Sequence, residues 1–188
     1  MLSQERKLEL LHSFDHQSLL AMMFSEEGNY IVQCFVLNLA PELIAWFVPL
    51  VDQKVLQLCR DKRGCRVIQR MLEKFPREVL RPVIDKIISA AIELTPQQYG
   101  NYVITHILQN GQNEEKTAIM QQLQDKILSL SLIQLGSNVV EACLKTELSP
   151  YKENILDRII NMPPASPVGS PEISFANLLE NQFGNYVI

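Results

Sequence analysis

The most regular feature of the sequence is a glycine that recurs together with a fixed set of apolar positions. Gly28, Gly64, Gly100, Gly136 and Gly184 are separated by 36, 36, 36 and 48 residues. The residue six positions before each glycine is apolar. The residues three, four, seven and eight positions after it are apolar too, as far as the chain extends. Positions +3, +4, +7 and +8 share one face of a helix with 3.6 residues per turn. Each glycine is therefore predicted to open an amphipathic helix.

A second helical stretch is predicted after each of the first four of these helices, at residues 41–48, 77–84, 114–123 and 151–160. No segment alternates apolar and polar residues for long enough to indicate a strand. The repeating unit is therefore all-helical. One such unit cannot bury its apolar face alone, so neighbouring units are expected to stack into a solenoid, right- or left-wound.

The pattern predicts a single repeat array over residues 1–188. The units are expected at roughly 12–48, 49–84, 85–120, 121–160 and 173–188, the last one incomplete. The array begins without a polar capping unit, and the chain ends inside the helix opened by Gly184. Since repeat arrays need polar caps, we expect a segment of a longer array whose open end exposes apolar surface.

The 48-residue interval contains an insertion at residues 161–172, which holds four of the ten prolines. Proline removes the backbone donor that a helix needs, so a surface loop is predicted. Its Ser166-Pro167 and Ser170-Pro171 pairs are candidate phosphorylation sites, or simply parts of a plain loop.

Composition places the chain among globular proteins, with 47% hydrophobic and 20% charged residues. The longest apolar run, residues 43–51, has nine residues, which is too short to span a membrane. The first residues lack the apolar core of a secretory signal. The four cysteines form no C-x-x-C pair, which favours free thiols in a reducing compartment, and a cytoplasmic location is expected.

Polar or planar residues occupy positions +1, +2 and +5 after the glycines. Positions +1 and +5 lie side by side on a helix because they are four residues apart, and position +2 projects beside them, away from the apolar stripe. The +1 and +5 residues are Asn29 and Gln33, Cys65 and Gln69, Asn101 and Thr105, Ser137 and Glu141, and Asn185. The +2 residues are Tyr30, Arg66, Tyr102, Asn138 and Tyr186. We call these the recognition positions.

Such a trio has the chemistry needed to recognise an unpaired base. A planar group stacks on the base, and two adjacent polar groups address its Watson–Crick edge. The amides of Asn29 and Gln33 suit the acceptor–donor–acceptor edge of uracil, and the Glu141 carboxylate suits the two donors of guanine. The alternative is that +1 residues merely cap helices and that the tyrosines pack. Recurrence of the pattern over five units favours recognition.

The segments at residues 99–104 (YGNYVI), 64–69 (GCRVIQ) and 136–141 (GSNVVE) resemble the repeats of the Pumilio/FBF (PUF) family of RNA-binding proteins. The resemblance spans about residues 12–188. It implies an all-α, right-handed, armadillo-like α-solenoid of about five PUF-type repeats. These correspond to the last five of the eight repeats that form the family's crescent, which binds RNA on its concave face. The inserted loop resembles the junction between the family's seventh and eighth repeats.

The resemblance also implies base preferences. Asn29, Gln33 and Tyr30 match a uracil-binding unit, Cys65, Gln69 and Arg66 an adenine-binding unit, and Ser137, Glu141 and Asn138 a guanine-binding unit. Asn185 and Tyr186 fit uracil, with the +5 position beyond the chain. Asn101 and Tyr102 fit uracil too, but Thr105 stands where the family has glutamine. Because family RNA runs antiparallel to the protein, the implied target is 5′-UGUAU-3′, with the weakest discrimination at the third base.

Charge is distributed unevenly. The formal net charge is −4, yet residues 54–86 hold ten Lys and Arg against four Asp and Glu, a local net of +6. Lys62 and Arg63 lie at a helix opening, where they are candidate phosphate contacts, or part of a solvated basic helix pair. The overall acidity predicts weak binding to arbitrary nucleic acid, so base recognition must supply the selectivity.

The sequence gives little support for metal binding or catalysis. His12 and His16 have a spacing that suits a metal on a helix, but they form only two ligands. His106 is expected on the surface, while Trp46 and Cys143 are expected to pack. No catalytic motif is present, so we expect no enzyme, cofactor, small-molecule substrate or membrane partner.

The family resemblance implies binding to messenger RNA 3′ untranslated regions, with control of translation or decay through repressor or deadenylation proteins. Two alternatives remain open. One is a protein-binding α-solenoid scaffold without RNA specificity. The other is a sequence-tolerant RNA binder similar to the family's ribosome-assembly relatives.

Overall fold

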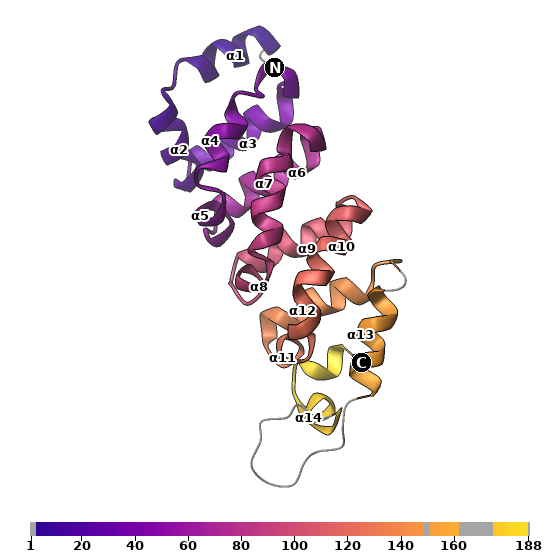
Figure 1. Ribbon diagram of the computed structural model, residues 1–188. Coiled ribbons are helices and arrows are strands. Elements are labelled where there is room, and N and C mark those ends of the chain that lie inside the picture. The colour runs from indigo at the N-terminus through magenta and orange to yellow at the C-terminus, as the bar shows by residue number, and fades with distance from the viewer. Residues whose placement is uncertain (1–2, 149–150, 162–174, 188) are drawn as a thin grey trace. The chain divides into compact units, whose positions relative to one another are not determined.

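The computed structural model describes residues 3–148, 151–161 and 175–187, and in these ranges every regular element is helical (Figure 1). Residues 162–172 of the predicted loop, with both candidate phosphorylation sites, lie outside the described residues. The chain forms two compact units, Met1–Ile87 and Ile88–Ile188. No helix in the described ranges is long and apolar enough to cross a membrane.

The first unit contains eight helical elements, the last of which extends two residues beyond it. They are α1 (Gln4–His12), α2 (His16–Phe24), α3 (Gly28–Asn38), η1 (Pro41–Leu43), α4 (Phe47–Asp52), α5 (Val55–Arg60), α6 (Gly64–Lys74) and α7 (Arg77–Ser89). The second unit continues with α8 (Ala91–Leu94), α9 (Gly100–Asn110), α10 (Asn113–Leu123), η2 (Gln124–Lys126), α11 (Ile127–Ser131), α12 (Gln134–Leu144), α13 (Tyr151–Ile160), α14 (Phe175–Glu180) and η3 (Gly184–Tyr186).

Each complete repeat contains a short helix that the sequence pattern did not predict. The helices α2, α5, α8, α11 and α14 precede the recurring glycines and carry the apolar residue at position −6. The two-helix unit expected from the sequence is thus a three-segment unit. The short helices have as few as four residues, so they complete too few turns to show a helical period.

The recurring glycines mark a close approach between helices. An added Cβ at Gly64 would lie 2.7 Å from the carbonyl oxygen of Leu58, and one at Gly100 would lie 2.6 Å from that of Leu94. These oxygens belong to the short helices, so no side chain fits where the next helix begins. Gly28, Gly64 and Gly100 start their helices, whereas Gly136 lies two residues inside α12 and Gly184 opens only the short η3.

The predicted apolar stripe forms the core. Val67, Val103 and Val139 at position +3 are fully buried, as are nearly all described residues at +4, +7 and +8. Ile31 is an exception, with 41% of its surface exposed. It belongs to the first repeat, where α3 packs on α1 and α2 and no earlier glycine-led helix is present in the chain.

The glycine-led helices α3, α6, α9 and α12 pack side by side within each unit. In the first unit α3 contacts α6, and in the second α9 contacts α12. This packing brings the recognition positions of consecutive repeats next to one another, α3 beside α6 and α9 beside α12.

Consecutive repeats are also joined by a recurring polar contact that the sequence did not reveal. Lys86 Nζ donates to Asp52 Oδ2 at 2.7 Å and to the Asp52 carbonyl oxygen at 3.1 Å. Arg158 donates to the Gln124 carbonyl oxygen at 2.7 Å and to Asp125 Oδ1 at 2.9 Å. In both units a basic residue of the third helix thus binds the preceding repeat, at the end of α4 in the first unit and at η2, which follows α10, in the second.

The two histidines with metal-like spacing pack on an aromatic ring. The His16 ring stacks on Trp46 with centroids 5.5 Å apart, and the His12 ring lies 5.9 Å from it. No group of metal-ligating side chains occurs among the described residues. The packing role expected for Trp46 is confirmed, and the spacing of the histidines reflects contact with this ring.

Candidate nucleic-acid interface

In three of the five repeats, the residue at position −3 caps the start of the glycine-led helix. Ser25 Oγ accepts from the Gly28 N–H, and Asp61 Oδ1 accepts from the Gly64 N–H, both at 2.8 Å. Asn181 Oδ1 accepts from the Gly184 N–H at 2.9 Å. These contacts satisfy helix-start donors. The −3 residues were not predicted, although Ser25, Asp61 and Asn181 form a visible polar column. The capping role considered for position +1 belongs to them.

The +1 side chains are more buried than the sequence pattern implied. Asn29 and Asn101 are only 2% and 1% exposed. Nδ2 of Asn29 donates to the carbonyl oxygens of Ser25 at 2.8 Å and Glu26 at 2.6 Å. Asn101 makes the same pair of bonds to Gln97 and Gln98, at 2.8 and 3.1 Å. Because both Nδ2 protons of each side chain donate to backbone carbonyls, the acceptor Oδ1 is the group that remains to contact a ligand.

Cys65 and Ser137 are held in the same way. Cys65 Sγ lies 3.5 Å from the Lys62 carbonyl oxygen, and Ser137 Oγ donates to that of Gln134 at 3.0 Å. Burial raises the pKa of the Cys65 thiol, so the thiol is neutral at physiological pH. Asn185 differs because it is exposed. In the first four repeats, the backbone thus orients each +1 group.

The +2 side chains project into solvent. Tyr30, Tyr102 and Tyr186 are 61%, 54% and 75% exposed, and Arg66 and Asn138 are exposed as well. Single exposed apolar side chains are common on protein surfaces, so the exposure of any one of these residues carries little weight. Their recurrence at one register indicates stacking surfaces.

The +5 side chains are half-buried beside the +1 groups. Gln33 Nε2 donates to Asn29 Oδ1 at 2.9 Å, so this predicted pair is formed in the structure. Thr105 differs, since its buried Oγ1 has no hydrogen-bond partner. Glu141 Oε1 instead accepts from Lys145 Nζ at 2.5 Å. Lys145 is a residue that the sequence analysis did not consider.

A cavity of about 530 Å³ joins the fourth repeat to the fifth. Its walls hold the three recognition residues of one repeat and the +2 tyrosine of the next. The lining residues are Gln134, Ser137, Asn138, Glu141, Gln182, Phe183 and Tyr186. Two +2 side chains and a +1/+5 pair therefore surround one space, which is the arrangement needed to stack a planar group and contact its edge.

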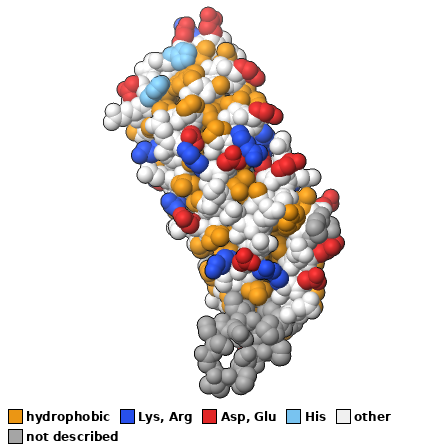
Figure 2. Space-filling model, viewed as in Figure 1, with side chains coloured by type: hydrophobic (Ala, Val, Ile, Leu, Met, Phe, Trp, Pro, Cys, Tyr) orange, Lys and Arg blue, Asp and Glu red, His pale blue; other side chains and the backbone are white. Residues whose placement is uncertain are grey.

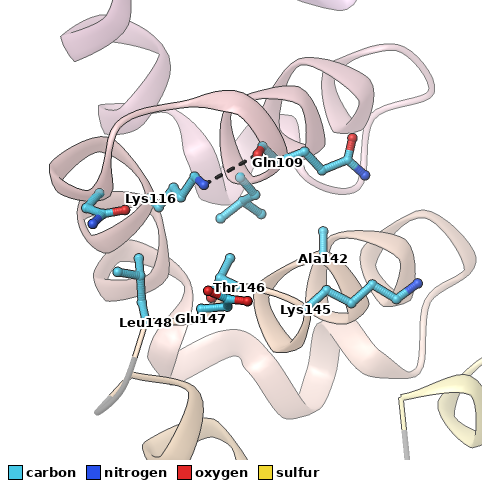
Figure 3. Close-up of a pocket in the computed structure, with 9 residues that line it drawn as sticks. Gln109, Lys116, Ala142, Lys145, Thr146, Glu147 and Leu148 are labelled. Carbon is cyan, nitrogen blue, oxygen red and sulfur yellow. Dashed lines mark hydrogen bonds between the residues drawn. The ribbon is translucent and has the colours of Figure 1, made fainter.

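A second cavity, of about 510 Å³, lies one turn further along α12 (Figure 3). Leu108, Ala142 and Thr146 line it together with Lys116, whose Nζ donates to the Gln109 carbonyl oxygen at 3.4 Å. Lys145 runs along its margin, and in Figure 3 its ammonium nitrogen points away from Lys116. Lys145 thus lines this cavity while it binds Glu141, which lines the first.

The basic residues are less available than the sequence suggested. The Arg63 guanidinium binds Glu26 Oε2 at 2.8 Å, which joins the openings of α3 and α6. Arg63 thus serves as a bridge between repeats in this structure, whereas Lys62 is exposed. Figure 2 shows Lys and Arg side chains interleaved with Asp and Glu on the face in view. On the face in view in Figure 2, acidic and basic side chains are mixed and form no single broad basic surface.

The fold and the recurring positions define a helical-repeat protein of the solenoid class, and comparisons identify its family. The family model described as "Pumilio-family RNA binding repeat" (PUF) matches residues 54–88, 91–124 and 126–160, together more than half of the chain. The chain belongs to the PUF family. The all-α repeat fold expected from the sequence is confirmed.

Relatives and solved structures agree with this assignment. Pumilio homology domain family member 4 of Saccharomyces cerevisiae is 27% identical over 165 residues, 86% of this chain and 18% of that protein. Pumilio homolog 12 of Arabidopsis thaliana is 25% identical over 185 residues, 98% of this chain and 29% of that protein. The chain therefore spans less than a third of the length of these relatives.

Two solved structures match almost the whole chain. The Puf3 RNA-binding domain bound to the Cox17 RNA 3′ UTR recognition sequence site A has a TM-score of 0.84 and 26% identity, covering 99% of this chain and 56% of that one. PUF-8 in complex with PBE-RNA has a TM-score of 0.87 and 23% identity, covering 99% and 53%.

Proposed function

We propose that the protein binds single-stranded RNA with one base per repeat, using the +1, +2 and +5 side chains. The observation that carries this proposal is the cavity of about 530 Å³ bounded by Ser137, Asn138, Glu141 and Tyr186. It provides two faces for stacking and a polar edge between them. Family membership supports the proposal, since PUF repeats recognise one base each.

The asparagine-containing repeats are proposed to select uracil. Their Nδ2 protons are used by backbone carbonyls, so Oδ1 faces the ligand as an acceptor. Uracil presents the N3–H donor that such an acceptor needs, whereas cytosine and adenine have an acceptor at the equivalent ring nitrogen. Gln33 Nε2, already directed at Asn29, then supplies a donor to a uracil carbonyl.

The fourth repeat is proposed to select guanine. Guanine carries two donors, N1–H and the N2 amino group, on its Watson–Crick edge, and the Glu141 carboxylate accepts both. Asn138 of the fourth repeat and Tyr186 of the fifth both line the cavity. Uracil is disfavoured here because its carbonyl oxygens would face the carboxylate. Cys65, Gln69 and Arg66 are assigned to adenine by family resemblance.

The proposed target is 5′-UGUAU-3′ within messenger RNA 3′ untranslated regions, with a post-transcriptional regulatory role in the cytoplasm. Among the relatives, Fem-3 mRNA-binding factor 1 of Caenorhabditis elegans is 25% identical over 190 residues, which cover 31% of that protein. Several of the matched structures hold 3′ UTR recognition sequences. Translational repressor or deadenylation proteins are the proposed partners, again by family resemblance.

Equilibrium binding to labelled RNA tests the proposal. We expect RNA containing UGUAU to bind at least tenfold, or about 1.4 kcal/mol, more tightly than RNA containing UCUAU at about 0.15 M salt. Equal binding to both RNAs by folded protein would contradict base recognition by the fourth repeat. Capture of a polypeptide with no RNA binding would favour the scaffold alternative.

A further inference from the structure

Lys145 lies one turn beyond Glu141 on α12, at position +9 from Gly136. Its Nζ is 2.5 Å from Glu141 Oε1. We propose that Lys145 is a positioning residue for guanine recognition, holding the Glu141 carboxylate in place while a base covers it. This inference rests on the proposed function of the fourth repeat.

The ion pair leaves room for a base. Lys145 contacts one oxygen of the carboxylate, Oε1, and each carboxylate oxygen can accept two hydrogen bonds. Oε2 and the second lone pair of Oε1 therefore remain for the N1–H and N2–H donors of guanine. The ion pair and the base can thus coexist at the same carboxylate.

With a base stacked in the cavity, the Glu141 carboxylate would need a nearby cation to stabilise its charge. Glu141 lines the cavity with Asn138 and Tyr186, so a base stacked there displaces water from the carboxylate. Loss of water penalises a charged group unless another charge compensates. Lys145 provides that charge from outside the cavity, with its side chain 72% exposed. It keeps its own hydration while stabilising Glu141.

The sequence register supports the pairing. Four repeats extend to position +9, where they carry Leu37, Glu73, Gln109 and Lys145. A lysine stands at this position in the repeat whose +5 residue is a carboxylate. In the other three repeats, position +5 is glutamine or threonine, a neutral residue that needs no counter-charge.

The test compares Lys145→Met with Lys145→Arg on two RNAs that differ at one base, UGUAU and UUUAU. We expect Lys145→Met to weaken binding to UGUAU by about three- to tenfold and to leave binding to UUUAU unchanged. Lys145→Arg should retain most of the affinity because it restores the charge. Lys126→Met, at an exposed lysine of η2, is the matched control for loss of one positive charge and should change neither.

The outcomes separate the competing explanations. If Lys145 instead contacts a phosphate, Lys145→Met would weaken binding to both RNAs equally. It would also lower the slope of log affinity against log salt concentration by about one unit. That result would overturn the inference. Unchanged UGUAU binding by Lys145→Met overturns it as well. If the unmodified protein shows no preference for guanine, the proposed function itself fails. Thermal unfolding of each variant confirms that the fold is intact.

Discussion

Gln33 donates a hydrogen bond from Nε2 to Oδ1 of Asn29 over 2.9 Å, so two side chains assigned to one base are already paired with each other. Asn29 is anchored in turn by two backbone carbonyls. This chain of bonds fixes the acceptor before any ligand arrives. Such pre-organisation lowers the entropic cost of binding.

The first prediction concerns the buried amide anchor. Replacing Asn101 with Asp removes both donors to the Gln97 and Gln98 carbonyls and buries a carboxylate. We expect a loss of about 1–3 kcal/mol in the free energy of unfolding, measured by denaturant titration. Asn138→Asp, the same change at an exposed position, should cost much less. Equal stability of Asn101→Asp and the unmodified protein would contradict the anchoring role.

The second prediction concerns the glycine period. A Cβ at Gly64 would meet the Leu58 carbonyl oxygen at 2.7 Å and Leu58 Cα at 2.8 Å, both of which are backbone atoms. Gly64→Ala should therefore destabilise the protein by about 1–3 kcal/mol, although alanine favours helices. Gln57→Ala, at an exposed position of α5, is the control. A stability gain for Gly64→Ala would show that the helices are not in such close contact.

The third prediction concerns the weak third repeat. Thr105 Oγ1 is buried without a partner, and threonine is too short to reproduce the bond that Gln33 makes to Asn29. Thr105→Gln should sharpen uracil preference at the third base by about three- to tenfold, measured by RNA binding. Thr105→Val keeps the side chain short, so it should leave the preference at the third base weak. An unchanged preference in Thr105→Gln would contradict this explanation.

The fourth prediction concerns the thiols. Burial raises the pKa of Cys59 to about 12 and that of Cys143 to about 12, from a usual value of 9.0. The unfolded chain loses these protons first, so the stability that the two buried thiols contribute should be constant below about pH 9 and fall as the pH rises from there toward 12. Alkylation at pH 8 followed by mass spectrometry should modify the exposed Cys34 first. Rapid labelling of Cys143 in folded protein would contradict the buried environment.

The sequence predicted the parts of the fold that repeat with strong periodicity. The helices α3, α6 and α9 follow from the 36-residue period of Gly28, Gly64 and Gly100 and from the apolar stripe. A buried helix face needs apolar residues in every turn, which makes the pattern visible in the sequence. The helix α8, with four residues, is too short to produce such a signal. The contact between Lys86 and Asp52 joins residues 34 positions apart, which no local pattern encodes. The −3 caps are local, but only three of the five repeats have them.

The candidate site was likewise predictable only in part. The +1, +2 and +5 residues were identified from their recurrence, and Tyr30 and Tyr186 are exposed as expected for stacking groups. The burial of Asn101 was not predicted, because the position next to the glycine lies on the helix surface when only the helix is considered. The turn between α8 and α9 supplies the Gln97 and Gln98 carbonyls that bind it. The partner of Arg63 was missed because Glu26 lies 37 residues away.

The central claim is that each repeat selects a base through its +1 and +5 side chains. The most direct measurement is the affinity of the Ser137→Asn, Glu141→Gln double variant for UGUAU and UUUAU RNA. We predict that the preference at the second base changes from guanine to uracil, with both forms equally well folded. Retention of the guanine preference would contradict the account.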